Sequence, residues 1–332
     1  MRIAILTAML CVSCYGCDPA SLAQHQYSGA TMGTTFNVKV VVATDQEPAE
    51  DLSQQLQQVL DDIEEQTSTY MQESELSRFN ENKSTDWTRV SQQLCRRVEQ
   101  ALSISRKTNG AFDITVGPLV NLWGFGPTGG RDKPPDETEI EALLARVGFD
   151  KLQSDCELPA LRKAHPRLYV DLSGWAKGFA ADELAEVLTG NGIENFLVEV
   201  GGELRAQGLN ASGEAWRIAI EKPSANGRDI QTVLNISNTG LATSGDYRNF
   251  FEYEGSRYSH TIDPRSGRPV THQLASVTVM HESAATADGL ATALLVLGPD
   301  DGIALATELG VKAIFVVRGP QGLESFTIPS TN

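Results

Sequence analysis

The segment from Ser259 to Val270 carries side chains that could do chemistry. In chain order it holds His260, Asp263, Pro264, Arg265, Gly267 and Arg268. A histidine can act as a general acid or base near neutral pH, or donate a hydrogen bond to a phosphate. The alternative is a histidine that is hydrogen-bonded within a turn at the end of a strand. We therefore take His260 as a candidate catalytic residue, and the two arginines more readily as surface residues than as phosphate ligands.

A second candidate is the pair Asp288 and Thr292. These residues lie four positions apart in a stretch expected to be helical from Ala284 to Leu297, so their side chains share one face. Carboxylate and hydroxyl oxygens are hard ligands that suit Mg²⁺, which takes few protein ligands and completes its shell with water and substrate phosphates. By itself the spacing favours a simpler interpretation, a solvated aspartate and a threonine packed against a turn.

The third candidate is the run from Val170 to Gly178. A strand expected at 168–172 ends in a turn at Ser173–Gly174, and a helix is expected from Trp175 to Leu188. Free backbone amides and the positive end of a helix would meet there, which suits an anion. Lys177 lies in the first helical turn, where the helix dipole disfavours a cation, so it is a candidate for binding a ligand anion. The alternative is a surface lysine beside a tight turn.

Aromatic residues next to glycines form a fourth group, which could stack on a planar ring or simply fill the core. Its members are Tyr70, Phe112, Trp123, Phe125 and Trp175. Neither a Walker A loop nor a dinucleotide-binding fingerprint is present, since Gly201–Gly202 lacks the required spacing.

The elements that must position these residues follow from hydrophobic periodicity. Strands are expected at 36–42, 168–172, 196–200, 216–220, 231–236, 248–253, 257–262, 275–280 and 313–317. Helices are expected at 52–63, after a cap at Ser91 as far as Asn109–Gly110, at 137–147, 175–188, 284–297 and 300–309. Because hairpins dominate the second half, an α+β fold with largely antiparallel sheets is favoured over a doubly wound parallel sheet.

Length, composition and charge limit the number of domains and the kinds of partner. The chain has 332 residues, 41% of them hydrophobic and 21% charged, which indicates one large or two closely packed globular domains. The formal net charge of −16 argues against nucleic acid as a partner, because such binding needs lysines and arginines to neutralise phosphates.

The N-terminus has the features of a bacterial lipoprotein signal. Met1–Arg2 is followed by an apolar run, Ile3–Val12, that is too short to span a bilayer about 30 Å thick. We expect a signal peptide at 1–17, lipid on Cys17, and a polar tether at 18–26. Cys14 is the alternative lipid site, and an ordinary secretory signal or truncated anchor is the alternative to lipidation. The remaining cysteines, Cys95 and Cys156, are not expected to form a disulfide framework.

Eight ordered motifs between residues 27 and 328 resemble the ApbE family of FAD:protein FMN transferases. They are Thr31-Met32-Gly33-Thr34, Ser68-Thr69-Tyr70, the run from Gly110 to Leu119, the run from Val170 to Gly178, Val200-Gly201-Gly202, the run from Ser244 to Arg248, the run from Ser259 to Gly267, and the run from Ala287 to Thr292. The resemblance implies an ApbE-like, T-fold-related α+β domain at 27–328.

The resemblance also implies an activity, which is the Mg²⁺-dependent transfer of the FMN moiety of FAD to a Thr or Ser of an acceptor protein through a phosphoester bond, with AMP released. The acceptor implied is a subunit of a membrane redox complex, and the location implied is the periplasmic side of the bacterial inner membrane, through a lipid anchor. With water as nucleophile, the same site would be an FAD pyrophosphatase giving FMN and AMP. A non-catalytic flavin-binding lipoprotein is the alternative from another class.

Carried over by motif, the resemblance assigns three sets of residues. Flavin contacts fall on Met32, Tyr70, Ala111, Phe112, Asp113, Asp171, Lys177 and Ile262. Metal contacts fall on Asp288, Thr292 and the backbone carbonyl of Gly174, and His260 would lie beside the pyrophosphate. The chain departs from the commonest pattern of the family at Gly174–Trp175, where small or aliphatic residues are more usual. Asp288 and His260 are both candidates for the catalytic base; our hypothesis is that Asp288 holds Mg²⁺ and assists deprotonation while His260 stabilises the leaving phosphate.

Overall fold

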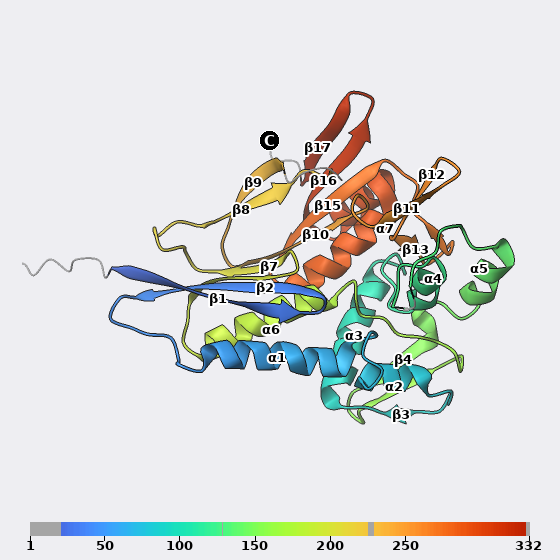
Figure 1. Cartoon of the computed structure of the whole chain (residues 1–332), viewed down its shortest axis with the longest axis horizontal. Coiled ribbons are helices and arrows are strands. Elements are labelled where there is room, and N and C mark those ends of the chain that lie inside the picture. Colours follow the sequence, from blue (N-terminus) through green and yellow to red (C-terminus); the bar gives the residue numbers. More distant parts are fainter. Residues whose placement is uncertain (1–20, 128, 225–228, 330–332) are drawn as a thin grey trace, which may run out of the picture.

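An eight-stranded antiparallel sheet forms the centre of the molecule (Figure 1). The computed structural model describes residues 21–127, 129–224 and 229–329, so the expected signal peptide and both candidate lipid sites, Cys17 and Cys14, lie outside the described residues. In spatial order the strands are β1 (Leu22–Thr31), β2 (Thr34–Ala43), β6 (Asn195–Val200), β7 (Glu203–Gln207), β10 (Thr239–Gly245), β15 (Leu274–His281), β16 (Lys312–Gly319) and β17 (Gly322–Ile328).

Each face of this sheet is covered by a different layer. Helices α1 (Leu52–Thr67) and α6 (Ala176–Gly190) lie below β1 and β2 in Figure 1, and the hairpin of β8 (Trp216–Glu221) and β9 (Ile230–Ile236) lies above. Successive side chains of a strand point to opposite faces of the sheet. Val40 therefore packs in the hydrophobic cluster between the sheet and the helices, and Val41 packs in the cluster between the sheet and β8. This alternation explains why β2 is apolar along most of its length.

Helix α7 (Ala284–Glu308) packs against α6, β10 and β15. It is two helices joined at a kink, because Gly298 has φ 81° and Pro299 follows it. This confirms the expectation of helices on either side of residues 298 and 299. By length and composition α7 could cross a membrane, but it is largely buried against the sheet and is a core helix.

The smaller elements gather around the right-hand end of the molecule in Figure 1. They are α2 (Glu75–Glu81), α3 (Gln92–Lys107), α4 (Gly117–Leu122), α5 (Glu137–Leu144), a 3-10 turn (Phe149–Lys151), the three-stranded sheet of β3 (Thr88–Arg89), β5 (Ala160–Lys163) and β4 (Leu152–Asp155), the hairpin of β11 (Phe250–Tyr253) and β12 (Ser256–Ser259), and the pair β13 (Ile262–Asp263) and β14 (Arg268–Pro269).

The predicted α+β class and most predicted elements are confirmed. Ser91 caps α3 by accepting a hydrogen bond from the amide of Leu94, as the sequence indicates. The β11–β12 turn at Glu254–Gly255 has both residues at positive φ, as expected of a tight hairpin.

The strand expected at Leu168–Leu172 is absent from the described structure, because this segment pairs with a side chain instead of a neighbouring strand. The Asn80 amide donates to the carbonyl of Val170 at 2.8 Å and its oxygen accepts from the Val170 amide at 2.7 Å. Asn80 thus satisfies the backbone groups that a ladder would otherwise pair. An isolated apolar run in the sequence cannot distinguish these two solutions.

The tether expected at 18–26 is wrong from Leu22 onward. Leu22–Gln26 forms the first half of β1, which pairs with β2 over its whole length. The sequence of β1 is polar because one of its faces meets solvent, so its residues alternate between exposed and half-buried.

The expectation for the two cysteines is also wrong, since Cys95 and Cys156 form a disulfide. Cys95 lies on α3, and Cys156 lies in the turn between β4 and β5. The two are 61 residues apart in sequence, and they meet because the small sheet folds back onto α3.

Candidate active site

Two adjoining compartments form the candidate site. The first, of about 430 Å³, lies between the α4 and β11–β12 regions and the start of α6 and α7; the second, of about 490 Å³, lies beside the β1–β2 turn and the end of α1. Both compartments are lined by Ser173 and Lys177, so they meet at the first turn of α6.

The structure brings together every residue assigned by motif. The first compartment is lined by Ala111, Phe112, Asp113, Asp171, Gly174, Lys177, His260, Ile262, Asp288 and Thr292, and the second by Met32, Tyr70 and Lys177. These residues come from distant parts of the chain, and the fold brings them to two compartments that share Ser173 and Lys177 in their walls.

Asp288 is held by α6. Its Oδ2 accepts a hydrogen bond from the backbone amide of Gly178 at 3.0 Å, and its side chain is buried. Gly178 allows this approach, because a Cβ there would lie 2.3 Å from the carbonyl oxygen of Ala284 and 2.8 Å from the Cβ of Asp288. Burial raises the pKa of Asp288, while Lys177 and the Gly178 amide act in the opposite direction.

Thr292 lies one turn beyond Asp288 and next to Gly174. Its Oγ1 is 3.5 Å from the position that a Cβ on Gly174 would take, and 3.3 Å from the hydroxyl of Ser244 on β10. A carboxylate, two hydroxyls and a nearby peptide carbonyl are all hard oxygen donors, which fits Mg²⁺. Among the described residues no group of three His, Cys, Asp or Glu side chains forms a metal cage, so any metal here would take much of its shell from substrate and water.

Lys177 points at a buried acid that the sequence analysis missed. Its Nζ lies 2.5 Å from Oε1 of Glu203 on β7. Burial alone would lower the pKa of Lys177, but Asp288 and Glu203 outweigh it and hold the pKa above its ordinary value. Lys177 is therefore a cation at neutral pH. Gly201, with φ 58°, leaves room for the lysine stem, since a Cβ there would lie 2.9 Å from Cδ of Lys177.

His260 is presented to the cleft as a neutral acceptor. Its Nδ1 lies 3.0 Å from the carbonyl oxygen of Asn249, and a carbonyl can only accept, so Nδ1 carries the proton. Burial lowers the pKa of His260 below its ordinary value, so the ring is neutral at pH 7 and Nε2 carries a free lone pair. Phe125 packs edge-on against the imidazole ring of His260, with 6.3 Å between the ring centroids.

The carboxylates of Asp171 and Asp113 organise the loops that line the cleft. Oδ1 of Asp171 accepts from the amide and hydroxyl of Ser173, at 2.9 and 2.6 Å. Asp113 accepts from the amide and hydroxyl of Thr115 and from the amide of Phe149, and it is buried. Asp113 therefore holds the turn of Ala111 and Phe112 in place, and those two residues offer the contact surface.

The second compartment is built around a strained turn. Met32 has φ 49°, a left-handed conformation that costs free energy in a residue other than glycine, and its amide donates to Oε1 of Glu64 at 2.7 Å. The same oxygen accepts from the Thr31 hydroxyl at 2.9 Å. Tyr70 lines the same compartment and is 69% exposed, so its ring is available to a ligand.

Several sequence candidates lie outside the two compartments. Arg265 pairs with Asp263 at 2.9 Å and Arg268 pairs with Glu137, so neither faces the cleft. Trp123 is buried, and its indole N–H donates to the carbonyl of Gly267, which fixes the turn that follows Ile262. Trp175 is buried in a stack with Phe179, at 4.6 Å between ring centroids, so the unusual Gly174–Trp175 pair leaves the cleft unobstructed.

Sequence reasoning missed Glu203, Glu64 and Asn80 as functional positions. Glu203 follows Gly201–Gly202 directly, and an acid beside a double-glycine turn could have been noted as a partner for Lys177. Glu64 and Asn80 lie on amphipathic helices, where polar residues are expected for solubility, so no local signal separates them from their neighbours.

Comparisons with known proteins agree with this geometry. Residues 32–315 match the ApbE family. The chain is 44% identical over 315 residues to a protein of Vibrio cholerae serotype O1 named FAD:protein FMN transferase, covering 95% of this chain and 93% of that protein. It is 42% identical over 304 residues to a Haemophilus influenzae protein of the same name, covering 89% and 87%.

Two solved structures are similar over almost the whole fold. The flavin transferase ApbE from Vibrio cholerae superposes with a TM-score of 0.85 at 43% identity, covering 92% of this chain and 97% of the other. The apo form of the flavinyl transferase ApbE from Pseudomonas stutzeri gives 0.84 at 40% identity, with 92% and 95% covered.

Proposed function

Because the chain belongs to the ApbE family, we propose that it is an FAD:protein FMN transferase, which moves the FMN moiety of FAD to a Thr or Ser hydroxyl of an acceptor protein and releases AMP. The single observation that carries this proposal is that Lys177 lies where two ligand-sized compartments meet, beside Asp288 and Thr292 and in the same compartment as His260. A dinucleotide has two bulky ends joined by a pyrophosphate, which matches two hollows joined at a cation.

The chain's own residues suit the transfer of a phosphoryl group. Lys177 would neutralise charge on the pyrophosphate, and Glu203 keeps it protonated and directed toward the junction. Asp288, Thr292 and the carbonyl of Gly174 would hold Mg²⁺. When bound, Mg²⁺ supplies Lewis-acid stabilisation of charge that develops on the phosphate oxygens.

We assign the proton transfer to His260, in a change from the hypothesis that Asp288 assists deprotonation. Nε2 of His260 has a free lone pair, whereas one oxygen of Asp288 already accepts from Gly178 and the carboxylate faces the metal position. The acceptor hydroxyl oxygen would form a bond to the phosphorus of the FMN half as its proton passes to Nε2. The bond from that phosphorus to the bridging oxygen breaks, and AMP leaves with this oxygen.

We further propose that the protein is lipid-anchored through Cys17 on the periplasmic side of the bacterial inner membrane, and that its acceptor is a subunit of a membrane redox complex. The Cys95–Cys156 disulfide supports a compartment outside the cytosol, because disulfides persist in oxidising surroundings.

Product analysis tests the proposal. The purified protein is incubated with FAD and Mg²⁺, with and without a candidate acceptor domain, and free FMN and AMP are separated by chromatography. A transferase gives AMP in step with flavin on the acceptor, and little free FMN. Equal amounts of free FMN and AMP without acceptor would indicate the pyrophosphatase instead, and intact bound FAD would indicate a flavin carrier.

A further inference from the structure

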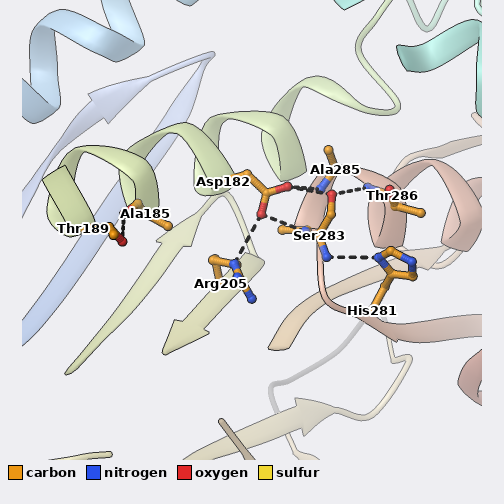
Figure 2. A network of polar contacts seen from close by, with 9 residues as sticks. Asp182, Ala185, Thr189, Arg205, His281, Ser283, Ala285 and Thr286 are labelled. Carbon is orange, nitrogen blue, oxygen red and sulfur yellow. Dashed lines mark hydrogen bonds and ion pairs between the residues drawn. The ribbon is translucent and has the colours of Figure 1, made fainter. Parts of the chain in front are cut away.

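We propose that Asp182 is a positioning residue for the metal ligands Asp288 and Thr292, although it lies outside both compartments. This inference rests on the proposed function, since it concerns the same metal site. Asp182 is on α6, four residues after Gly178, and its carboxylate meets the start of α7 (Figure 2).

The carboxylate of Asp182 caps α7 with both oxygens. Oδ1 accepts from the amide of Ala284 at 2.9 Å, and Oδ2 accepts from the amide of Ala285 at 3.0 Å and from the hydroxyl of Ser283 at 2.8 Å. Figure 2 shows these bonds converging from one side chain on the first turn of the helix. A helix start needs partners for its first amides and favours a negative charge, so Asp182 supplies both.

The cap is completed by two further side chains. Ser283 Oγ accepts from the amide of Thr286 at 3.1 Å, and Nδ1 of His281 accepts from the amide of Ser283 at 3.0 Å. Every backbone amide from Ser283 to Thr286 therefore has a side-chain acceptor. Asp288 and Thr292 follow on the next two turns of the same helix, so their positions depend on how α7 begins.

Asp182 also joins three of the elements that build the candidate site, α6, α7 and β7. Its Oδ1 lies 3.6 Å from the guanidinium of Arg205 on β7. The same strand carries Glu203, two residues earlier and on the same face, which pairs with Lys177 of α6. Asp182 thus ties α6 to α7 and β7 at one point, and each of these elements contributes a side chain to the site.

Two polar links join α7 to α6, in addition to the apolar packing between the helices. One is the hydrogen bond from Gly178 to Asp288, and the other is the cap by Asp182 one turn further along α6. Apolar packing also holds α7 against α6, but it is not directional, so these two polar links set the register of one helix along the other. Loss of the cap leaves a single polar link, made by the metal ligand itself, so the ligand oxygens are held less precisely.

The test measures binding of Mn²⁺, as a paramagnetic substitute for Mg²⁺, by its free electron spin resonance signal, in FAD-saturated protein without acceptor. Asp182→Asn keeps the shape but removes the charge and one acceptor oxygen. We expect it to weaken Mn²⁺ binding about 3- to 30-fold, the range that corresponds to loss of a helix N-cap, because Asp182 acts through the start of α7 and does not contact the ligands themselves. FAD affinity, followed by flavin fluorescence, should change much less. Glu186→Gln, an exposed acid one turn further along α6, is the matched control and should leave both affinities unchanged.

Equal Mn²⁺ affinity in wild type and a folded Asp182→Asn variant would overturn the inference. If that variant does not fold, Ser283→Ala and Arg205→Gln take its place, each removing one link and each expected to weaken Mn²⁺ binding about threefold to tenfold; unchanged affinity in both would overturn it equally. Failure of the wild-type protein to bind Mn²⁺ would instead overturn the metal site of the proposed function, and this inference with it.

Discussion

At the level of single residues, the chemistry of the site depends on which polar side-chain atoms remain free to meet a ligand after the protein's own hydrogen bonds are formed. Both carboxylate oxygens of Asp113 accept hydrogen bonds from protein groups, whereas Asp171 accepts through Oδ1 alone and His260 uses only Nδ1. The functional contrast among these polar residues therefore comes from their hydrogen-bond partners, since residue type alone makes all three plausible catalysts.

The assignment of His260 as proton acceptor predicts a specific pH dependence. Because burial lowers the pKa of His260, the ring stays neutral down to a pH below its ordinary pKa of about 6.5. Transfer should be independent of pH above that value and fall as pH drops through the lowered pKa. His260→Gln should lower the transfer rate about 10²- to 10⁴-fold, abolish this acidic limb, and leave FAD binding intact.

Rates of flavin transfer between pH 5 and 8, measured at saturating FAD, check this prediction. His165→Gln is the control, since His165 lies outside both compartments. A His260→Gln variant with the wild-type rate and the same acidic limb would show that another group takes the proton.

At the scale of elements, the close contact of α6 and α7 sets the site. Gly178→Ala should lower the free energy of unfolding by about 1–3 kcal/mol, because the new methyl group would overlap the Ala284 carbonyl and Asp288. Gly190→Ala, at the end of the same helix and with no atom within 4 Å of the new Cβ, should be neutral or stabilising by up to about 1 kcal/mol. Urea unfolding of both variants measures the difference, and equal stability of the two would contradict the proposed contact.

Elements with a strong local pattern were predictable from the sequence. Ser91 marks the start of helix α3 and Asn109–Gly110 marks its end. In β2, apolar and polar residues alternate over the first half of the strand, as expected of a half-buried strand. The segment 168–172 was not predictable, because its partner is the side chain of Asn80 from a distant helix. Strands β1 and β17 were missed because their exposed positions are largely polar. Strands β7 and β10 lie inside the sheet, but they carry charged or small residues and their neighbours come from distant parts of the chain.

The candidate site was likewise predictable only in part. The ordered motifs contain the residues that face the cleft, whereas Glu203, Glu64 and Asp182 act by holding other groups and have no local pattern of their own. Their roles become visible only when the partners, which come from other elements, are in place.

At the scale of the whole molecule, the disulfide braces the helical end against the small sheet. Replacing Cys95 and Cys156 together by alanine should lower the free energy of unfolding by about 2–4 kcal/mol, since the cross-link restricts a long loop of the unfolded chain. Neither cysteine lines a compartment, so flavin transfer below the unfolding transition should be unchanged. A reducing agent should destabilise the wild type and have no effect on the double variant. Equal stability of the two proteins under oxidising conditions would show that the cross-link contributes nothing.

The site is built from residues that lie far apart in the sequence. Residues from β1–β2, α6, β7, α7 and the segment after β12 meet because the antiparallel sheet places β7 and β10 side by side under α6 and α7. The protein carries a formal net charge of −16, so the affinity for a pyrophosphate must come from the local cation and metal position at this junction.

Flavin transfer can be read from the intact mass of an acceptor protein after incubation with this protein, FAD and Mg²⁺. We expect the acceptor to gain the mass of FMN less one water, and we expect no gain when its Thr or Ser is replaced or when the enzyme carries Asp288→Ala. An unmodified acceptor, with FAD converted to free FMN and AMP, would show that the protein is not a transferase, and full transfer by Asp288→Ala would refute the role of Asp288.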